Sequence, residues 1–290
     1  MNDYIIMTDS CSDMPLAMVS ELGVEVMPLK FTIGGNTYTN YSDNRDMPIK
    51  EFYSRLRNGE QSKTSQINPD EFTSYFEPHL KEGKDILYIA FSSALSGTYK
   101  SSLIAAEDLK EKYPERRIEC FDSLCACIGQ TAFVWYVANM KKSGYDMNEV
   151  LDWLNANRLH LCHWFTVEDL MHLKRGGRIS AATAIAGTML KIKPILHVDD
   201  EGRLINVGKV RGRKASLDAI VDKAGETGID ISNQTVFISH GDCEDEAEYV
   251  AEQLRKKYGV KNIVIDFIGP VIGAHAGPGT MAVYFLGTQR

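Results

Sequence analysis

The sequence predicts an α/β fold whose N-terminal part is a parallel sheet with helices on both faces. Short apolar runs alternate with helical segments along the first half of the chain, and buried parallel strands need such helical crossovers. The length of 290 residues favours two domains over one core. From residue 159 onward the chain is richer in basic turns, strand-like runs and glycine-rich connections. We therefore expect two domains, 1–158 and 159–290, each of the α/β class.

The N-terminal elements can be placed in order. The expected strands are the apolar or β-rich runs at 4–8, 24–33, 86–91 and 117–121. The expected helices are 15–22, 48–58, 70–82, 97–112 and 147–157. The helix at 70 has the clearest start, because Asn68 suits the N-cap, Pro69 the first helical position, and Glu71 can complete a capping box. We expect Pro78 to kink or shorten this helix.

Residues 123–140 contain no charged side chain, which raises the question of a membrane span. Gln130 and Asn139 make the segment poorer than a typical spanning helix. A helix buried against a sheet has the same appearance at this length. We therefore expect a core helix and no stable membrane insertion.

The composition is that of an ordinary globular protein, with 44% apolar and 24% charged residues. A net charge of −7 argues against nucleic acid as the main partner. The six cysteines form no CxxC pair. The apolar run at the start of the sequence is too short for a signal peptide. We expect a cytoplasmic protein.

Hydroxyl side chains follow three of the expected strands, at 8–10, 92–98 and 122–123. Ligands of open α/β sheets sit beyond the carboxyl ends of the strands. The second segment runs through Ser96, Gly97 and Thr98 into a helix, whose amide groups and dipole suit an anion. Taken alone, Ser96 or Thr98 would more often be a helix cap. A further pair, Thr64 and Ser65, is expected in a loop.

The residues restrict the kind of anion. The sequence contains no GxxxxGK[ST] or GxGxxG phosphate loop, and Ser96 lacks the G-x-S-x-G setting of a hydrolase serine. The pattern His160-Leu161-Cys162-His163 lacks a second ligand pair, so no metal site is expected. A singly charged oxyanion such as a carboxylate is favoured. A hydrolase or phosphatase that uses Asp9 or Ser96, and a carrier of another amphiphile such as a lipid phosphate, stay open.

The C-terminal half adds two features. The segment from Lys174 to Lys214 contains ten lysines and arginines and three acidic residues, a local charge of +7. Such a segment is either a solvated face or a docking surface for an acidic partner. His275 lies in the glycine-rich stretch "IGPVIGAHAGPG", where a structural and a functional role are equally plausible.

Together these segments resemble the successive signatures of the DegV family of bacterial fatty-acid-binding proteins. The resemblance is collinear and covers nearly the whole chain. It is carried by "IIMTDSCSDMP", "TSQ", "LSGTYKSS", "FDS", "LKRGGRIS", "GKVRGRKA" and "IGPVIGAHAGPG". It implies an N-terminal parallel α/β domain, a C-terminal α/β domain with an antiparallel sheet, and one long-chain fatty acid between and within them.

The resemblance also implies site residues. The family's carboxylate-binding pair falls on Thr64 and Ser96, and neighbouring motif positions fall on Ser65, Gly97, Thr98 and His275. The chain departs from the family pattern where many relatives read TSQPS, since here Ile67 and Asn68 follow Gln66. It also lacks an acidic residue in "NTYTN" at 36–40.

Members of the family resemble the lipid-carrying subunits of a two-part fatty acid kinase, in which a separate ATP-binding protein phosphorylates the carboxylate to an acyl phosphate. On this resemblance the chain is no enzyme by itself and needs no cofactor besides the bound fatty acid. Four residues of the basic segment become candidates for meeting the kinase or the new phosphate: Arg175, Arg178, Arg211 and Arg213.

Overall fold

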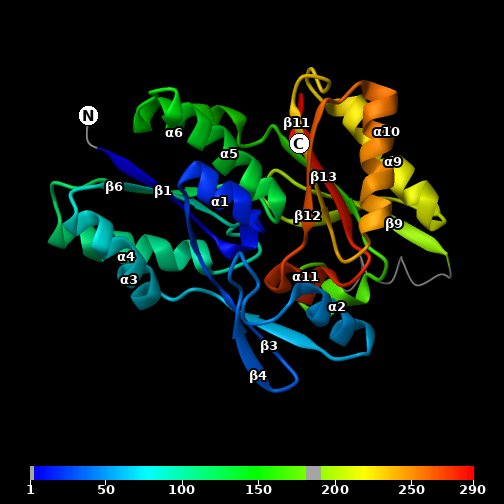
Figure 1. The fold of residues 1–290 in the computed structure, drawn as a ribbon, viewed down its shortest axis with the longest axis horizontal. Helices are drawn as coiled ribbons and strands as arrows, with labels where there is room; N and C mark the ends of the chain where they lie inside the picture. The colour runs from blue at the N-terminus through cyan, green and yellow to red at the C-terminus, as the bar shows by residue number, and fades with distance from the viewer. Residues whose placement is uncertain (1–2, 181–190) are drawn as a thin grey trace.

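The computed structural model describes residues 3–180 and 191–290 and contains three sheets (Figure 1). The first sheet has the order β2-β1-β6-β7, and all its strand pairs are parallel. Its strands are β1 (Tyr4–Asp9), β2 (Glu25–Met27), β6 (Asp85–Ala90) and β7 (Ile118–Asp122). The predicted parallel sheet is confirmed.

Helices cover both faces of this sheet (Figure 1). One face carries α3 (Pro69–Lys81) and α4 (Thr98–Lys112). The other carries α1 (Leu16–Leu22), α5 (Ile128–Lys142) and α6 (Met147–Asn157). Most side chains of α5 are buried, and the helix contacts strands of the first and second sheets, so it is the expected core helix.

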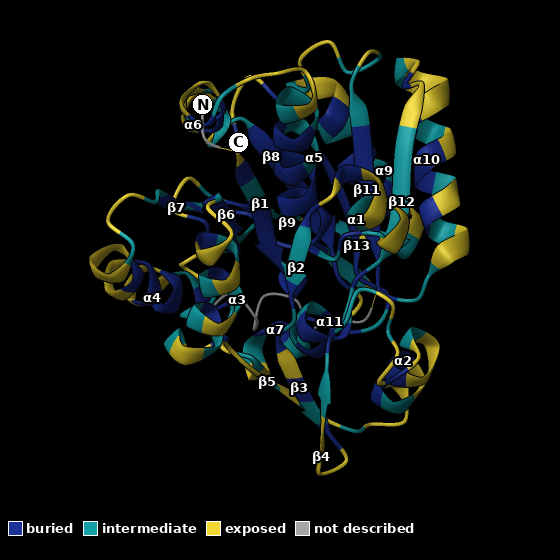
Figure 2. Ribbon diagram, turned by 60° about the vertical axis from the view of Figure 1, so that its left-hand side comes forward, coloured by how far each residue is buried: buried dark blue, intermediate teal, exposed yellow. Residues whose placement is uncertain are grey.

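The second sheet has the order β10-β9-β8-β13-β11-β12, with antiparallel pairs except for β11 and β12. Its strands are β8 (Leu161–Thr166), β9 (Ile192–Val198), β10 (Leu204–Arg211), β11 (Thr235–His240), β12 (Asn262–Phe267) and β13 (Met281–Leu286). The helices α9 (Arg213–Thr227) and α10 (Glu244–Tyr258) cover the face opposite α5. The strands β8, β11 and β13 between these layers are largely buried, whereas the edge strands β10 and β12 are partly exposed (Figure 2).

A third, antiparallel sheet corrects two expectations. It has the order β4-β3-β5 and is formed by β3 (Lys30–Ile33), β4 (Asn36–Thr39) and β5 (Ser62–Ser65). The apolar run 24–33 is therefore two strands in two sheets, separated at Pro28, which has no N–H to donate to a ladder. Thr64 and Ser65 lie in a strand and not in a loop.

The short helices α7 (Met171–Arg175) and α11 (Pro270–Ala276) pack against each other, and α11 also contacts β3, β5 and α2 (Ile49–Arg57). A 3₁₀ turn, η1 (Ser10–Ser12), follows β1 and also contacts α11. These contacts bring the small sheet, which is formed by the first half of the chain, against segments of the second half.

The start of α3 is as predicted. The Asn68 side chain accepts from the Glu71 amide at 2.9 Å, and the Glu71 carboxylate accepts from the Asn68 amide at 3.0 Å, a complete capping box. Pro78 does not shorten the helix, which continues to Lys81. In the part of the chain that the structure describes, no helix combines the length and apolarity needed to cross a bilayer.

Candidate functional site

A mostly apolar cavity of about 190 Å³ lies where the three sheets meet. Its apolar wall comes from both halves of the chain. It is formed by Leu29, Phe91, Leu95, Ala126, Phe165, Leu173, Val198, Leu204, Ile268, Val271, Ile272, Ala276 and Ala282. Polar residues from separate elements also reach the cavity, and they include Thr64, Ser65, Gln66, Ser96, Gly97, Arg178 and His275. Of the hydroxyl segments that the sequence singled out, 64–65 and 92–98 reach this cavity, through Thr64, Ser65 and Ser96, whereas 8–10 and 122–123 do not line it.

Thr64 and His275, which are 211 residues apart in the sequence, are hydrogen-bonded in the wall of this cavity. The distance between Thr64 Oγ1 and His275 Nε2 is 2.8 Å. Burial, and then the nearby Arg178 charge, lower the pKa of His275 to about 4, so the imidazole is neutral at physiological pH. Gly176 permits the close approach of α7, because a Cβ there would lie 2.2 Å from His275 Nδ1. Neutral His275 can therefore orient the Thr64 hydroxyl without adding charge.

Ser96 lies at the start of α4 and is supported by Thr98. The two hydroxyl oxygens are 2.9 Å apart, and Ser96 Oγ accepts from the Thr98 amide at 3.2 Å. Thr98 is fully buried and is not among the residues that line the cavity, and its contact with a ligand stays a prediction. Its position indicates that Thr98 holds Ser96 in place.

Gly97 brings Gln66 to the cavity. A Cβ at Gly97 would lie 2.1 Å from Gln66 Oε1, so only glycine leaves room for the amide. Gln66 Nε2 donates to Ser101 Oγ at 3.2 Å, which fixes the orientation of the amide. Gln66 was not among the expected site residues, although it belongs to the "TSQ" motif and lines the cavity.

Arg178 also belongs to the cavity wall. Its Nε and Nη2 donate to the Leu95 carbonyl at 3.2 and 3.0 Å, and Nη1 donates to the Gly176 carbonyl at 2.5 Å. No carboxylate of the described residues forms an ion pair with it, and burial lowers its pKa. A half-buried guanidinium whose partners among the described residues are neutral carbonyls is suited to a bound anion.

The four arginines of the basic segment do not all line one site. Arg175 is exposed and, with Arg178, lines an open hollow of about 340 Å³ that shares Thr64, Arg178 and His275 with the cavity. Arg211 is exposed at the end of β10. Arg213 forms an ion pair with Glu246.

Asp9 does not line the cavity, and its carboxylate is saturated with donors. Asp9 Oδ2 accepts from Tyr88 Oη at 2.6 Å and from the Phe91 amide at 3.1 Å, and Oδ1 accepts from the Cys11 amide at 3.0 Å. Burial raises the pKa of Asp9 and these hydrogen bonds oppose the shift. The arrangement fixes the carboxyl ends of β1 and β6 and leaves Asp9 unavailable as a nucleophile.

Within residues 3–180 and 191–290, Ser96 has no hydrogen bond to a base that could activate it as a nucleophile. The Ser96 hydroxyl is hydrogen-bonded to the hydroxyl of Thr98, which cannot act as a general base. Among the described residues, no group of three histidine, cysteine or acidic side chains could hold a metal ion. The site therefore combines polar side chains with a mostly apolar cavity wall.

Comparison with known proteins places this site in a family. A family model described as "Uncharacterised protein, DegV family" matches residues 4–288. A DegV domain-containing protein of Clostridium perfringens is 48% identical over 290 residues, which cover 100% of this chain and 99% of the relative. The chain belongs to the DegV family.

Solved DegV structures have the same fold. A Thermotoga maritima protein, described as revealing a fatty acid binding function, has a TM-score of 0.86 at 28% identity and covers 99% of this chain and 100% of its own. DegV of Bacillus subtilis, described as a fatty acid binding protein, has a TM-score of 0.85 at 28% identity with the same coverage. The α/β fold with an N-terminal parallel sheet and a C-terminal mixed, mainly antiparallel sheet is confirmed.

The position of His275 in this DegV chain gives a testable pH dependence. An unfolded chain protonates histidine near pH 6.5, whereas folded His275 is protonated only near pH 4. The unfolded state therefore binds the extra proton first, and the stabilisation from neutral His275 is complete above about pH 6.5 and lost as the pH falls towards 4.

We expect an NMR titration of the ligand-free protein to show His275 neutral at pH 5.5. We also expect the free energy of unfolding to fall less between pH 7 and pH 5 in His275→Asn than in the wild type. An imidazole that titrates near 6.5 would show that His275 is not buried as described.

Proposed function

We propose that this chain binds one long-chain fatty acid, with the alkyl chain in the apolar cavity and the carboxylate at Thr64, Ser96 and Arg178. One observation carries the proposal: the apolar cavity ends in hydroxyls and in a guanidinium that forms no ion pair with a carboxylate of the described residues. The DegV proteins of T. maritima and B. subtilis, whose descriptions name fatty acid binding, support it.

The two parts of the ligand have different roles. Burial of about fifteen methylene groups at ~0.8 kcal/mol each supplies on the order of 12 kcal/mol before the costs of binding are subtracted. The buried carboxylate would lose several kcal/mol of solvation unless donors replace water. The alkyl chain of the ligand thus provides the affinity, and Thr64, Ser96 and Arg178 set the orientation of the carboxylate.

The same geometry supports a carrier that presents the carboxylate to a separate ATP-dependent fatty acid kinase in the cytoplasm, which converts it to an acyl phosphate. The open hollow gives a partner access to Thr64, Arg178 and His275, and exposed Lys63 and Arg175 line it. These cations suit a transferred phosphoryl group. On this proposal the chain contributes no catalytic nucleophile, which agrees with the saturated Asp9 carboxylate and with the hydrogen bonding of Ser96 to Thr98.

The carboxylate site is tested by removing single hydroxyls. We expect Thr64→Ala and Ser96→Ala each to weaken fatty acid binding by about 10- to 150-fold, because each loses a charge-assisted hydrogen bond of ~1.5 to 3 kcal/mol. Titration calorimetry with palmitate measures the affinity. The matched control is Ser93→Ala, an exposed hydroxyl on the same loop that does not line the cavity. Unchanged affinity in both site variants would refute the assignment.

Presentation to the kinase is tested at the exposed arginines. We expect charge reversal at Arg175 and Arg211 to slow acyl phosphate formation by the kinase at limiting carrier concentration, while fatty acid affinity stays within about twofold, since rim charges act mainly on the association rate. Lys256→Glu, on the outer helix α10, is the control. Equal rates for the double variant and the control would exclude these arginines from docking.

A further inference from the structure

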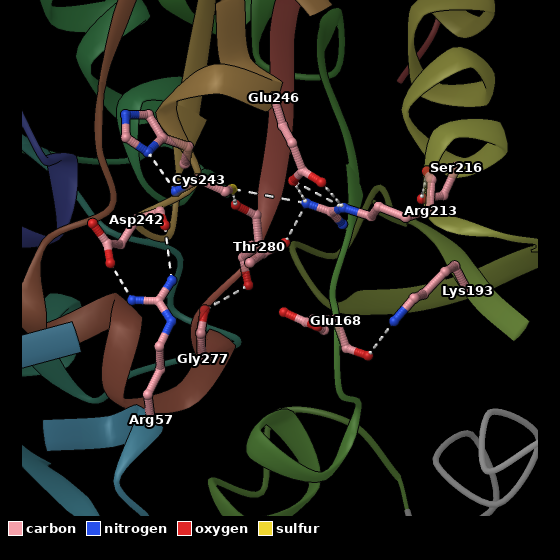
Figure 3. A network of polar contacts seen from close by, with 12 residues as sticks. Arg57, Glu168, Lys193, Arg213, Ser216, Asp242, Cys243, Glu246, Gly277 and Thr280 are labelled. Atoms are coloured by element: carbon pink, nitrogen blue, oxygen red, sulfur yellow. Dashed lines mark hydrogen bonds and ion pairs between the residues drawn. The ribbon is translucent and has the colours of Figure 1, made fainter. Parts of the chain in front are cut away.

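The ion pair between Arg213 and Glu246 holds the connection between α11 and β13 (Figure 3). Arg213 Nε lies 3.0 Å from both Glu246 carboxylate oxygens, and Nη2 lies 2.5 Å from Oε2. The same Nη2 donates to the Gly279 carbonyl at 2.6 Å. The guanidinium therefore joins the starts of α9 and α10 to residues 277–280.

The backbone conformation of residues 277–280 is only weakly restricted by these residues themselves. Gly277 and Gly279 both have positive φ, at 82° and 72°, and glycine has the largest conformational freedom in the unfolded chain. Neither glycine has a side chain to pack. The position of this connection therefore depends on hydrogen bonds and on the groups that pack against it.

Those hydrogen bonds form a chain through the neighbouring turn. The Gly279 amide donates to the Gly241 carbonyl at 2.7 Å, and the Gly241 amide donates to the Thr280 carbonyl at 2.8 Å. The next residue, Asp242, forms an ion pair with Arg57 of α2 and accepts from Arg57 Nη2 through its carbonyl at 2.8 Å (Figure 3). Gly241 also needs to be glycine, because a Cβ there would lie 2.7 Å from the Gly277 carbonyl.

The connection is in turn fastened to the last turn of α11. Thr280 Oγ1 donates to the Ala276 carbonyl at 3.0 Å and to the Gly277 carbonyl at 2.9 Å. Ala276 directly follows His275, whose Nε2 lies 2.8 Å from Thr64 Oγ1. A shift of residues 277–280 would therefore move the imidazole away from the Thr64 hydroxyl.

We infer that Arg213 is a positioning residue for the head-group site: it keeps His275 against Thr64 by holding Gly279, and it does not act as a free docking cation. The inference rests on the proposed function in so far as His275 and Thr64 serve a bound carboxylate. It replaces the expected role of Arg213 in meeting a kinase. Glu246 already neutralises the guanidinium, which leaves exposed Arg211 as the docking candidate in this segment.

A double-mutant cycle tests whether Arg213 acts through His275. Palmitate affinity is measured for the wild type, Arg213→Gln, His275→Ala and the double variant. We expect Arg213→Gln to weaken binding by about tenfold in the wild-type background and by less than about twofold in the His275→Ala background. The same loss in both backgrounds, or no loss in the wild type, would overturn the inference.

NMR of the ligand-free protein with labelled histidine separates this inference from the proposed function. Arg213→Gln should shift the imidazole signals of His275, whereas Lys214→Gln, which removes a neighbouring exposed charge, should not. If the wild type bound no fatty acid but these shifts were seen, the proposed function would fail and the positioning role would stand. If Arg213→Gln left the His275 signals unchanged, the positioning role would fail whatever the protein binds.

Should Arg213→Gln not fold, Arg213→Lys and Glu246→Gln provide the test. Each keeps one partner of the pair and loses the two-pronged geometry. We expect both to shift the His275 signals in the same direction and to weaken palmitate binding by a smaller factor. Wild-type signals and affinity in both variants would overturn the inference.

Discussion

Replacement of Arg178 by glutamine is expected to weaken fatty acid binding by about 10- to 150-fold, which corresponds to ~1.5 to 3 kcal/mol for a charged hydrogen-bonding partner. The guanidinium is half-buried in the cavity wall, and its partners among the described residues are the carbonyls of Leu95 and Gly176. Glutamine keeps a donor of smaller reach and loses the charge, so the buried carboxylate would lose its counter-ion.

The measurement is titration calorimetry with palmitate, compared with the uncharged alcohol hexadecanol. We expect the loss for palmitate to be much larger than the loss for the alcohol, because the alcohol has no charge to neutralise. The palmitate affinity of Arg178→Lys should lie between those of Arg178→Gln and the wild type, since lysine keeps the charge but lacks the planar guanidinium. The control is Lys174→Gln, which lies in the same segment but does not line the cavity. Equal losses for the two ligands would contradict the role of Arg178 as counter-ion.

Filling the cavity is expected to abolish binding. Ala282 is 4% exposed and lies on β13 in the cavity wall. The phenylalanine ring in Ala282→Phe would occupy space that the alkyl chain needs, and the existing cavity limits the overpacking cost, which is typically ~1 to 3 kcal/mol. We therefore expect a folded protein without measurable palmitate binding.

Thermal unfolding with and without palmitate checks this prediction. The wild type should unfold at a higher temperature when palmitate is present, because a ligand that binds only the folded state stabilises it. The melting temperature of Ala282→Phe should not respond to palmitate, and that of Ala282→Ser should respond nearly as the wild type does. A full response in Ala282→Phe would place the alkyl chain outside this cavity.

Much of the fold could be predicted from local patterns. The fully buried strand β6 is a continuous apolar run, and the start of α3 at Asn68 carries every residue of a capping box. Such signals are confined to a few neighbouring residues. The polar strand β5, "SKTS", has no apolar alternation and is recognisable only by its pairing with β3, for example Phe31 with Thr64.

The site was predictable in its residue types but not in the role of each residue. Thr64, Ser96 and His275 were selected from motifs and do line the cavity. Whether an arginine faces a cavity, as Arg178 does, or an acid on another helix, as Arg213 does, depends on tertiary contacts between distant segments. The role of Thr98 was not predictable for the same reason, because its hydroxyl is hydrogen-bonded to Ser96.

The most direct measurement is mass spectrometry of the protein purified from bacterial cells, first intact under native conditions and then as an organic extract. We expect a mass increase of one long-chain fatty acid per chain in the native spectrum and the same free acid in the extract. The Thr64→Ala, Ser96→Ala double variant should carry markedly less of it. A chain that carries no lipid, or only lipid phosphates, would contradict a cavity built for a carboxylate.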